Sequence, residues 1–287
     1  MAKIIDGKEI SKQIKEEVKQ KVADYKAQGI EICLAVIQVG ADPASSVYVN
    51  NKKKGCEYTG MKSLSYELSE ETTEDELLEL IDKLNKDDAV NGILVQLPLP
   101  KHIDEDKVIK AIDPKKDVDG FHPQSVGALN IGQPGFVSCT PAGVIELLKR
   151  SGVAIEGKEC VVVGRSNIVG KPMSALLLRE NGTVTICHSR TVNLKEVTKR
   201  ADILVVAIGK PKFITAEYVK EGAAVIDVGI HAIGTTPEGK RILCGDVDYD
   251  SVEPIASAIT PVPGGVGPMT IAMLMNNCVE SVKIQGR

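Results

Sequence analysis

The sequence has no tryptophan, and aromatic residues make up only 3% of its 287 residues. Proteins that bind single-stranded nucleic acid stack bases on exposed aromatic rings, so this composition argues against that class. Lysine and arginine together number 35, against 39 aspartates and glutamates, which gives a formal net charge of −4 at pH 7. Because nucleic-acid-binding domains usually carry a basic excess, no nucleic-acid partner is expected.

Closely spaced cysteines are missing as well. The seven cysteines form no C-x-x-C pair and lie far apart, at positions 33, 56, 139, 160, 187, 244 and 278. An odd, scattered set is typical of reduced thiols in an intracellular protein and argues against a disulfide framework or a zinc site. The four histidines share no metal-ligand spacing, so we expect no metal; they lie at positions 102, 122, 188 and 231.

Long apolar runs are also absent. The N-terminal stretch MAKIIDGKEISKQIKEEVKQ becomes charged at once and contains no apolar signal core. No stretch approaches the roughly 18 apolar residues that span a bilayer. We therefore expect a cytoplasmic protein that makes no membrane contact.

What the sequence does contain is the material for a globular core, with 43% hydrophobic and 26% charged residues. A chain of this length forms one large domain or two ordinary ones, since domains usually have roughly 100–200 residues. Up to residue 100 the hydrophobic pattern alternates between the period of a helix and that of a strand. The expected helices lie over 9–25, through 48–52 and over 72–85, and the expected strands over 32–40, 64–68 and 90–100. The strand over 32–40 is expected to be buried, and the helix over 72–85 begins with a capping box of Thr73 and Glu76. The helix over 9–25 has an apolar stripe made of Ile10, Ile14, Val18, Val22 and Tyr25.

Between residues 113 and 141 the sequence becomes rich in glycine, proline, asparagine and aspartate, which is the strongest boundary signal in the chain. Thr140 followed by Pro141 resembles a helix N-cap and the first helical position. The second series that follows has strands expected over 159–164, 183–188, 203–209 and 223–230, and helices over 172–181, 193–201, 216–222 and 267–284. This alternation predicts a doubly wound parallel sheet. We expect one domain over 1–138, to which a C-terminal helix in 268–287 returns, and a second domain over 139–267.

A glycine turn follows the first strand of the second series. Gly164 and Gly170 enclose Arg165 and Ser166 in the stretch GRSNIVGKP. Such a turn lets backbone N–H groups at a helix N-terminus approach a pyrophosphate. The match to G-x-G-x-x-G is degenerate, because Ser166 replaces the second glycine and the last glycine comes one residue late. A tight packing turn is the alternative, but the position of the turn at the first strand of the series favours a dinucleotide.

The end of the next strand indicates which dinucleotide. An NAD-binding fold usually places an acid there, to bind the ribose 2′-hydroxyl. This chain has His188, Ser189 and Arg190 instead, and Arg165 in the glycine turn adds a second positive charge. Each arginine alone is more often a surface residue. Because arginine and serine bind a 2′-phosphate that an acid would repel, the pair favours NADP over NAD.

The stretch SSVYVNNKKKG raises the question whether Lys52, Lys53 and Lys54 form a solvated charge run, which is the usual case, or include a working group. On a helix, Tyr48 and Lys52 share a face and can reach one ligand together, whereas Lys53 and Lys54 point elsewhere and are expected to be solvated. Burial of Lys52 would lower its pKa from about 10.4 and fit it for proton transfer near neutral pH.

Two other polar positions also have two interpretations. Gln96, in VQLPLP, is either a buried strand residue satisfied by the backbone or part of a site. Asp117 and Asp119, in KKDVDGFHP, either shape a turn or supply a carboxylate to a ligand. The residues alone leave both alternatives open.

Taken together, SSVYVNNKKKG, GILVQLPLP, KKDVDGFHP, GRSNIVGKP, TVTICHSRT and TPVPGGVGPMT resemble the methylenetetrahydrofolate dehydrogenase/methenyltetrahydrofolate cyclohydrolase proteins, the bifunctional folate enzymes of the FolD type. The resemblance runs over essentially the whole chain in the same order. It implies two α/β domains flanking a cleft, the second a Rossmann-type doubly wound parallel sheet, and commonly a homodimer formed through that second domain. It further implies a folate substrate, NADP as cofactor, and a place in one-carbon metabolism.

The resemblance also implies residue roles. Lys52 matches the catalytic lysine, Tyr48 the tyrosine that packs on and orients the folate, Gln96 the glutamine that hydrogen-bonds the lysine, and Asp119 the carboxylate that grips the pterin ring. The expected cofactor-binding positions are Gly164, Arg165, Ser166, Gly170, Ser189, Arg190 and Ile230. The loop over 261–270 matches one that borders substrate and nicotinamide, and its expected substrate-binding residues are Pro263, Gly264 and Thr270.

Two other functions remain as alternatives. A shikimate- or amino-acid-type dehydrogenase would share the second domain but not the helix that carries Tyr48 and Lys52. A nucleotide-sensing module without catalysis would keep the glycine turn and need no lysine.

Overall fold

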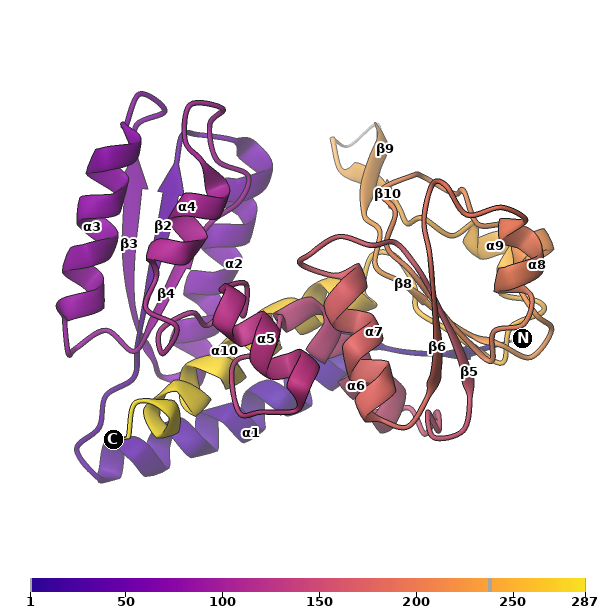
Figure 1. The fold of residues 1–287 in the computed structure, drawn as a ribbon, viewed down its shortest axis with the longest axis horizontal. Coiled ribbons are helices and arrows are strands. Elements are labelled where there is room, and N and C mark those ends of the chain that lie inside the picture. The colour runs from indigo at the N-terminus through magenta and orange to yellow at the C-terminus, as the bar shows by residue number, and fades with distance from the viewer. Residues whose placement is uncertain (1, 237–238, 287) are drawn as a thin grey trace. The chain divides into compact units, whose positions relative to one another are not determined.

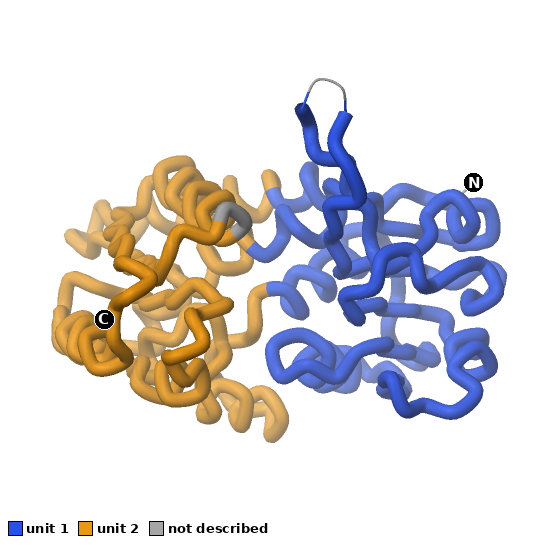
Figure 2. The backbone as a smooth tube through the Cα atoms, turned by 90° about the horizontal axis from the view of Figure 1, so that it is seen from above, with its two compact units in different colours: residues 1–11, 140–270 blue, residues 12–139, 271–287 orange. Residues whose placement is uncertain are grey.

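The structure is a computed structural model that describes residues 2–236 and 239–286, the side chains of residues 43 and 44 excepted. The chain divides into two compact units, each built from two separate segments (Figure 2). Unit 1 consists of residues 1–11 and 140–270, and unit 2 of residues 12–139 and 271–287. Each unit combines parallel strands with helices, so the expected α/β class is confirmed.

Unit 1 contains a six-stranded sheet in which all neighbouring strands are parallel (Figure 1). In spatial order the strands are β1 (Lys3–Ile4), β11 (Ala258–Ile259), β8 (Ala224–Asp227), β7 (Ile203–Val206), β5 (Glu159–Val163) and β6 (Thr183–Cys187). After β5 the chain adds β6 on one side and then β7, β8 and β11 on the other. This reversal makes the carboxyl ends of β5 and β7 the switch point of a doubly wound sheet, where ligands bind. The sequence prediction of such a sheet is confirmed.

The first strand shows a difference from the expected domain limits. The N–H groups of Lys3 and Ile5 donate to the carbonyls of Ser257 and Ile259 at 2.8 and 2.9 Å, and β1 thereby joins the sheet of unit 1. We expected residues from 1 onward in the other domain. A strand of two residues is too short to show a hydrophobic period, so the sequence pattern could not reveal this pairing.

Unit 1 also contains helices and a hairpin outside this sheet. They are α6 (Cys139–Arg150), α7 (Gly170–Arg179), α8 (Leu194–Thr198), the 3₁₀ turn η1 (Ala216–Tyr218), α9 (Tyr249–Val252) and an antiparallel hairpin of β9 (His231–Thr235) and β10 (Arg241–Cys244). The helix expected over 216–222 is wrong, because only one 3₁₀ turn forms there. Val219 is extended and buried in the core, and Gly222 has a φ of +80°, so neither continues a helix.

The predicted N-cap at Thr140 is also wrong. Helix α6 begins one residue earlier, so Thr140 lies in its first turn. Pro141 is tolerated there, because the first N–H groups of a helix have no intrahelical partner. The Thr140 hydroxyl instead hydrogen-bonds the Thr270 hydroxyl at 2.9 Å.

Unit 2 contains a three-stranded parallel sheet in the order β3 (Lys62–Leu68), β2 (Cys33–Val39), β4 (Gly92–Val95). All residues of the central strand β2 are buried. Apolar side chains of α3 (Glu74–Lys86) and α4 (Glu105–Ala111) pack with those of β2 and β4, whereas α2 (Pro43–Thr59) packs against β2 and β3 (Figure 1). The remaining helices with residues in this unit are α1 (Gly7–Ala27), α5 (Pro123–Ile131) and α10 (Val266–Ile284). The predicted apolar stripe of α1 is confirmed, since Ile10, Ile14, Val18 and Val22 are buried and Tyr25 is partly buried.

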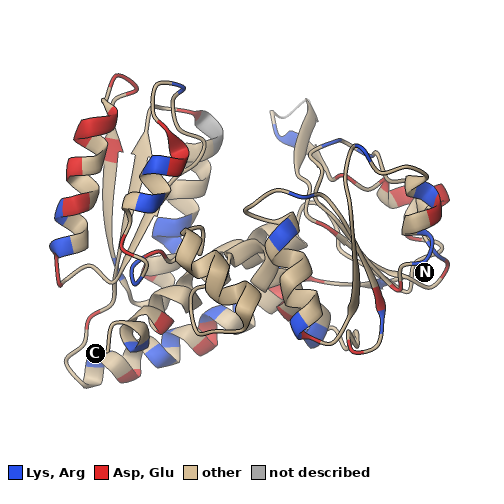
Figure 3. Cartoon of the chain, viewed as in Figure 1, with Lys and Arg blue, Asp and Glu red and all other residues tan. Residues whose placement is uncertain are grey.

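Helix α3 shows how local sequence defines an element. Glu76 N–H donates to Thr73 Oγ1 at 3.3 Å and the Glu76 carboxylate accepts from Thr73 N–H at 2.8 Å, which confirms the predicted capping box. Acidic residues fill its first turn and basic residues its last (Figure 3). This order of charges stabilises the helix by opposing its macrodipole.

The C-terminal end of α3 depends on a buried lysine. Lys116 is 5% exposed, and its ammonium donates to the carbonyls of Leu84 and Asp87 at 2.9 and 2.7 Å. Carbonyls at the end of a helix have no intrahelical donor. Lys116 therefore ties the segment before Asp117 to the end of α3.

We expect Lys116→Met to lower the free energy of unfolding by about 2 kcal/mol, because it keeps an apolar stem but leaves two carbonyls without this donor. Urea denaturation measures the change. Lys115→Met is the matched control, since the Lys115 side chain is exposed, and it should change the stability by less than about 0.5 kcal/mol. Equal effects of the two substitutions would contradict a structural role specific to Lys116.

Candidate active site

Helix α2 carries the tyrosine and the lysine predicted to act together. It begins at Pro43, before the stretch over 48–52 that we expected to be helical, because Asp42 Oδ2 accepts from Ser45 N–H at 2.7 Å and caps the helix. Tyr48 and Lys52 are one turn apart and share a face. Tyr48 is 37% exposed, whereas Lys52 is only 7% exposed. An exposed ring thus precedes a buried amine, as a ligand that packs on one and reaches the other would require.

Gln96 fixes the lysine. It directly follows β4, and its Oε1 accepts from Lys52 Nζ at 2.8 Å. Its own Nε2 donates to the Leu97 carbonyl at 2.6 Å, and its backbone N–H donates to Ile37 at 2.8 Å. Because the amide nitrogen is already bonded, the oxygen must face the lysine. Of the two interpretations of Gln96, the structure thus shows direct contact with Lys52.

The two aspartates of the KKDVDG stretch have different environments. The buried carboxylate of Asp117 accepts from the N–H groups of Phe121 and His122 at 3.2 and 2.8 Å and from Ser125 Oγ at 2.9 Å. Burial raises the pKa of Asp117 to about 7, although these three donors oppose the shift. Asp117 therefore shapes the turn that leads into α5.

Asp119, in contrast to Asp117, does not accept hydrogen bonds from the described residues of its turn. No hydrogen bond to its carboxylate occurs within residues 2–236 and 239–286, and the residue is only partly buried. Burial raises the pKa of Asp119, and the nearby charge of Lys52 opposes the shift. A carboxylate without a hydrogen-bond donor, close to Lys52, can accept hydrogen bonds from a ligand.

The electrostatics of Lys52 match its environment. Burial lowers the pKa of the Lys52 ammonium, and the charge of the Asp119 carboxylate opposes this shift. Gln96 is neutral, so its hydrogen bond holds the amine without a carboxylate that would favour the charged form. A larger share of Lys52 is therefore neutral near pH 7 than for a solvated lysine.

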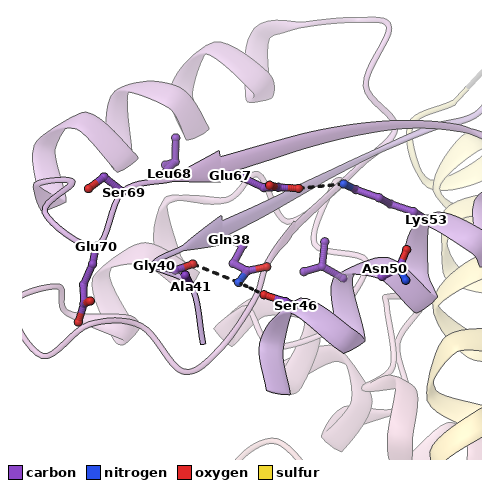
Figure 4. A pocket seen from close by; sticks show the side chains of 11 residues that line it. Gln38, Gly40, Ala41, Ser46, Asn50, Lys53, Glu67, Leu68, Ser69 and Glu70 are labelled. Carbon is purple, nitrogen blue, oxygen red and sulfur yellow. Dashed lines mark hydrogen bonds and ion pairs between the residues drawn. The ribbon is translucent and has the colours of Figure 1, made fainter. Parts of the chain in front are cut away.

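The other two lysines of the run differ from each other. Lys54 is exposed, whereas Lys53 forms an ion pair with Glu67 on β3 at 3.0 Å. This ion pair is exposed to solvent, and it forms because α2 lies against β3 and places Lys53 within reach of that strand. Lys53 and Glu67 line a cavity of about 670 Å³ together with polar side chains that include Gln38, Ser46 and Asn50 (Figure 4).

The glycine turn of unit 1 is tightly packed. A Cβ at Gly164, whose φ is +134°, would lie 2.2 Å from the carbonyl oxygen of Ala207, which follows β7. A Cβ at Gly170 would lie 2.3 Å from the carbonyl oxygen of Gly164. The packing interpretation thus explains both glycines. The same close packing brings the turn to the switch point between β5 and β7, where a dinucleotide would bind.

Ser166 bonds the backbone where the next helix begins. Its hydroxyl oxygen accepts from the N–H groups of Val169 and Gly170 at 3.2 and 3.3 Å, at the start of α7. The hydroxyl proton remains available for an acceptor. Ser166 can therefore donate to an anion next to the positive end of the helix.

The predicted 2′-phosphate residues lie at the ends of neighbouring strands. Val163 of β5 pairs with Cys187 of β6, and Arg165 and Ser189 each follow two residues later. Arg165, Ser189 and Arg190 are all exposed. No ion pair joins either arginine to a carboxylate within the part of the chain that the structure describes. Two arginines without an acidic partner at one edge of the sheet fit a phosphate.

The remaining predicted residues also belong to unit 1. Ile230 is exposed and follows β8, the strand beside β7. Pro263 is exposed, Gly264 is buried with a φ of +113°, and Thr270 bonds Thr140 as described above.

Sequence reasoning missed a carboxylate that supports the loop after β7, close to the switch point of the sheet. Asp246 is fully buried and accepts from the N–H groups of Ile208, Gly209 and Lys210 at 2.7, 3.1 and 2.8 Å. His231 Nε2 lies 2.8 Å from Asp246 Oδ1. Asp246 therefore holds the loop after β7 and the residue next to Ile230. The stretch GDVD, with an acid between apolar residues, was the available signal.

Two further residues near Asp119 were also missed. Cys139 is buried, and its pKa is raised well above the usual range by burial and by the charge of Asp119. Asn277 on α10 donates to the Val118 carbonyl, one residue before Asp119. Nothing in the helical pattern around Asn277 distinguished it from its neighbour Asn276.

Over the described ranges, no helix is long and apolar enough to cross a membrane. Over the same ranges, no group of His, Cys, Asp and Glu side chains is arranged to hold a metal ion.

Comparison with known proteins identifies the family. Residues 5–119 match the catalytic domain of tetrahydrofolate dehydrogenase/cyclohydrolase, and residues 138–286 match its NAD(P)-binding domain. The bifunctional protein FolD of Agathobacter rectalis is 74% identical over 283 residues, which are 99% of this chain and 100% of the relative.

Solved structures agree. The FolD methylenetetrahydrofolate dehydrogenase/cyclohydrolase of Campylobacter jejuni has a TM-score of 0.94 at 51% identity, covering 99% of this chain and 100% of that one. The Trypanosoma brucei FolD, solved with NADP cofactor and an inhibitor, has a TM-score of 0.93 at 39% identity, covering 100% and 99%. The resemblance noted from the motifs is thus confirmed over both domains, and the chain belongs to the tetrahydrofolate dehydrogenase/cyclohydrolase family.

Proposed function

We propose that this protein catalyses two consecutive steps on a reduced folate in one-carbon metabolism. First, hydride passes from the methylene bridge of 5,10-methylenetetrahydrofolate to NADP⁺, giving NADPH and the cationic 5,10-methenyl form. Second, water adds to the methenyl carbon, a proton is lost, and the ring opens to 10-formyltetrahydrofolate. The observation that carries the proposal is the buried Lys52 amine held by the neutral Gln96 amide in a chain of this family.

Residues of unit 2 would bind the folate. Tyr48 offers an exposed ring on which the substrate can pack, and Asp119 offers a carboxylate that can accept from the pterin N–H edge. We assign folate binding to residues 12–139 with 271–287, and cofactor binding to residues 140–267. Pro263, Gly264 and Thr270, which belong to unit 1, are the further substrate-binding residues that the family resemblance implies.

The dehydrogenase step depends on binding and orientation. NADP supplies the hydride chemistry when bound, and the protein positions the two partners. Gly164 and Gly170 let the turn pack closely, the Ser166 hydroxyl would donate to the cofactor at the start of α7, and Ile230 follows β8, the strand next to β7.

The cyclohydrolase step depends on Lys52. The methenyl carbon is electrophilic, and water that attacks it must lose a proton. A neutral amine accepts that proton, and burial favours this neutral form by lowering the pKa of Lys52. A cationic substrate beside the amine would lower the pKa further, while Gln96 keeps Nζ in place.

We further propose a homodimer and a cytoplasmic location. Strand β6 lies at the edge of its sheet, and Leu178, Ile186 and Val192, on or near it in sequence, are exposed apolar residues. A second copy that packs here would cover both the strand edge and these side chains. All seven cysteines are free, as is typical of a reducing compartment.

The direct test of the activity mixes the purified protein with methylenetetrahydrofolate and NADP⁺ and follows the near-ultraviolet absorbance of NADPH. Loss of methenyltetrahydrofolate is followed separately. Activity in only one assay would reduce the proposal to a single step, and activity in neither would contradict it.

Lys52→Met should abolish methenyl hydrolysis but leave measurable hydride transfer, because hydride transfer needs no general base. Lys53→Met and Lys54→Met are matched controls and should keep both activities near normal. Assaying the two reactions separately on all three variants gives the result. A Lys52→Met enzyme that hydrolyses methenyltetrahydrofolate at the wild-type rate would exclude the assigned role.

Arg165→Ala and Arg190→Ala should each raise the KM for NADP⁺ about tenfold, or about 1.4 kcal/mol, and leave that for NAD⁺ nearly unchanged. The reason is that each arginine would pair with the 2′-phosphate, which NAD⁺ lacks. Arg179→Ala, an exposed arginine at the end of α7, is the control. Equal losses with both cofactors would refute the assignment.

Asp119→Ala should weaken folate binding by roughly 30- to 100-fold, about 2–3 kcal/mol, because the pterin donors would lose a charged acceptor. NADP⁺ affinity should stay within about twofold. Separate titrations of folate and NADP⁺ measure both. If folate affinity is unchanged, Asp119 only shapes its turn.

A further inference from the structure

Helix α10 reaches the turn that carries Asp119. Asn277, on this helix, is 6% exposed, and its Nδ2 donates to the carbonyls of Val118 at 2.8 Å and Val137 at 2.9 Å. The same nitrogen lies 3.6 Å from Cys139 Sγ. A single amide group therefore joins the backbone just before Asp119 to the segment over 137–139.

The turn is held against that segment from its other side as well. Gly120 has a φ of +72°, and a Cβ there would lie 2.7 Å from both Ser138 N and the Val137 carbonyl carbon. Cys139 Sγ lies 3.5 Å from the Val118 carbonyl oxygen and can donate to it. Because the backbone on both sides of Asp119 is fixed, the direction in which the Asp119 side chain leaves the backbone is fixed as well.

A second amide, just after the end of α10, bonds backbone that precedes the Asp119 turn in the sequence. Gln285 Nε2 donates to the carbonyls of Asn91 and Lys115 at 2.7 and 2.9 Å. Asn91 directly precedes β4, and Gln96 directly follows it. The C-terminal helix thus bonds the backbone upstream of Gln96, which contacts Lys52, and of Asp119, whose charge influences it.

We propose that Asn277 is a positioning residue for the folate site: by holding the Val118 carbonyl, it sets the direction in which Asp119 presents its carboxylate beside Lys52. This inference rests on the proposed role of Asp119 in binding folate. Asn277 itself does not touch the substrate in this proposal.

The chemistry of the side chain supports this role. An amide nitrogen has two protons, and here each has a carbonyl acceptor from a different stretch of chain. An apolar residue of similar size would fill the same space but leave the Val118 carbonyl free to turn. The alternative role is purely structural, in which Asn277 only satisfies buried carbonyls in the core of unit 2.

A double-mutant cycle separates the two roles. Asn277→Ala, Asp119→Ala and the double variant are prepared in the full chain, and the dissociation constants of methenyltetrahydrofolate and NADP⁺ are measured for each. Asn276→Ala is the matched control, because this neighbouring asparagine on the same helix accepts a hydrogen bond from Lys21 at the surface, at 3.4 Å.

We expect Asn277→Ala to weaken folate binding about tenfold in the wild-type background and by less than about twofold in the Asp119→Ala background. NADP⁺ affinity should not change, and Asn276→Ala should have no effect on either ligand. In the dehydrogenase assay the KM for folate should rise while kcat stays within about twofold, since the hydride-transferring partners are unchanged.

Equal losses in both backgrounds would show that Asn277 supports the unit without acting through Asp119, and would overturn the inference. If Asp119→Ala itself leaves folate binding intact, the proposed role of Asp119 fails instead, and the two failures are distinguishable. Asn277→Ser keeps one donor, and it replaces the alanine variant in the cycle if thermal melting shows that Asn277→Ala does not fold.

Discussion

In both units, several candidate site residues follow the ends of parallel strands. A crossover connection returns the chain to the same end of the sheet, so successive parallel strands finish at one edge. Gln96 follows β4 in unit 2, and Gly164 and Ser189 follow β5 and β6 in unit 1. Side chains far apart in the sequence gather at these edges without any specific attraction between them. The specific contacts, such as that between Lys52 and Gln96, then refine an arrangement that the topology already provides.

Burial and the charge of Asp119 have opposite effects on the pKa of Lys52. Burial lowers the pKa of Lys52 and so favours the neutral amine, whereas the charge of Asp119 favours the ammonium. In the same way, burial raises the pKa of Asp119, and the charge of Lys52 opposes that shift. A neutral hydrogen-bond partner such as Gln96 fixes the amine without adding to this balance. A bound cation would shift it toward the free base, so the site is sensitive to the charge of its ligand.

Sequence patterns predicted what depends on local periodicity or on several residues in one motif. The buried strands, the capping box at Thr73 and the common helix of Tyr48 and Lys52 all belong to this class, and the family motifs added Gln96 and Asp119. Contacts made by single residues across long separations were not predictable. The pairing of β1 and the amide of Asn277 depend on partners more than a hundred residues away, and Val219 becomes extended because the core buries it. The ion pair of Lys53 with Glu67 spans only 14 residues, but it depends on the packing of α2 against β3, which the sequence pattern does not give.

The interleaving of the two units has a consequence for the order in which the chain is made. Unit 2 needs residues 271–287, which leave the ribosome after the whole of unit 1 has been synthesised. Until then its strands and the Asp119 turn lack the amides of Asn277 and Gln285, and carbonyls that the finished protein buries remain open to water. The last strand of unit 1 is β11, so all strands of unit 1 are synthesised before residues 271–287. A nascent chain can therefore complete its cofactor sheet while its folate-binding half is still unfinished, and that half is the one exposed longest to chaperones and proteases.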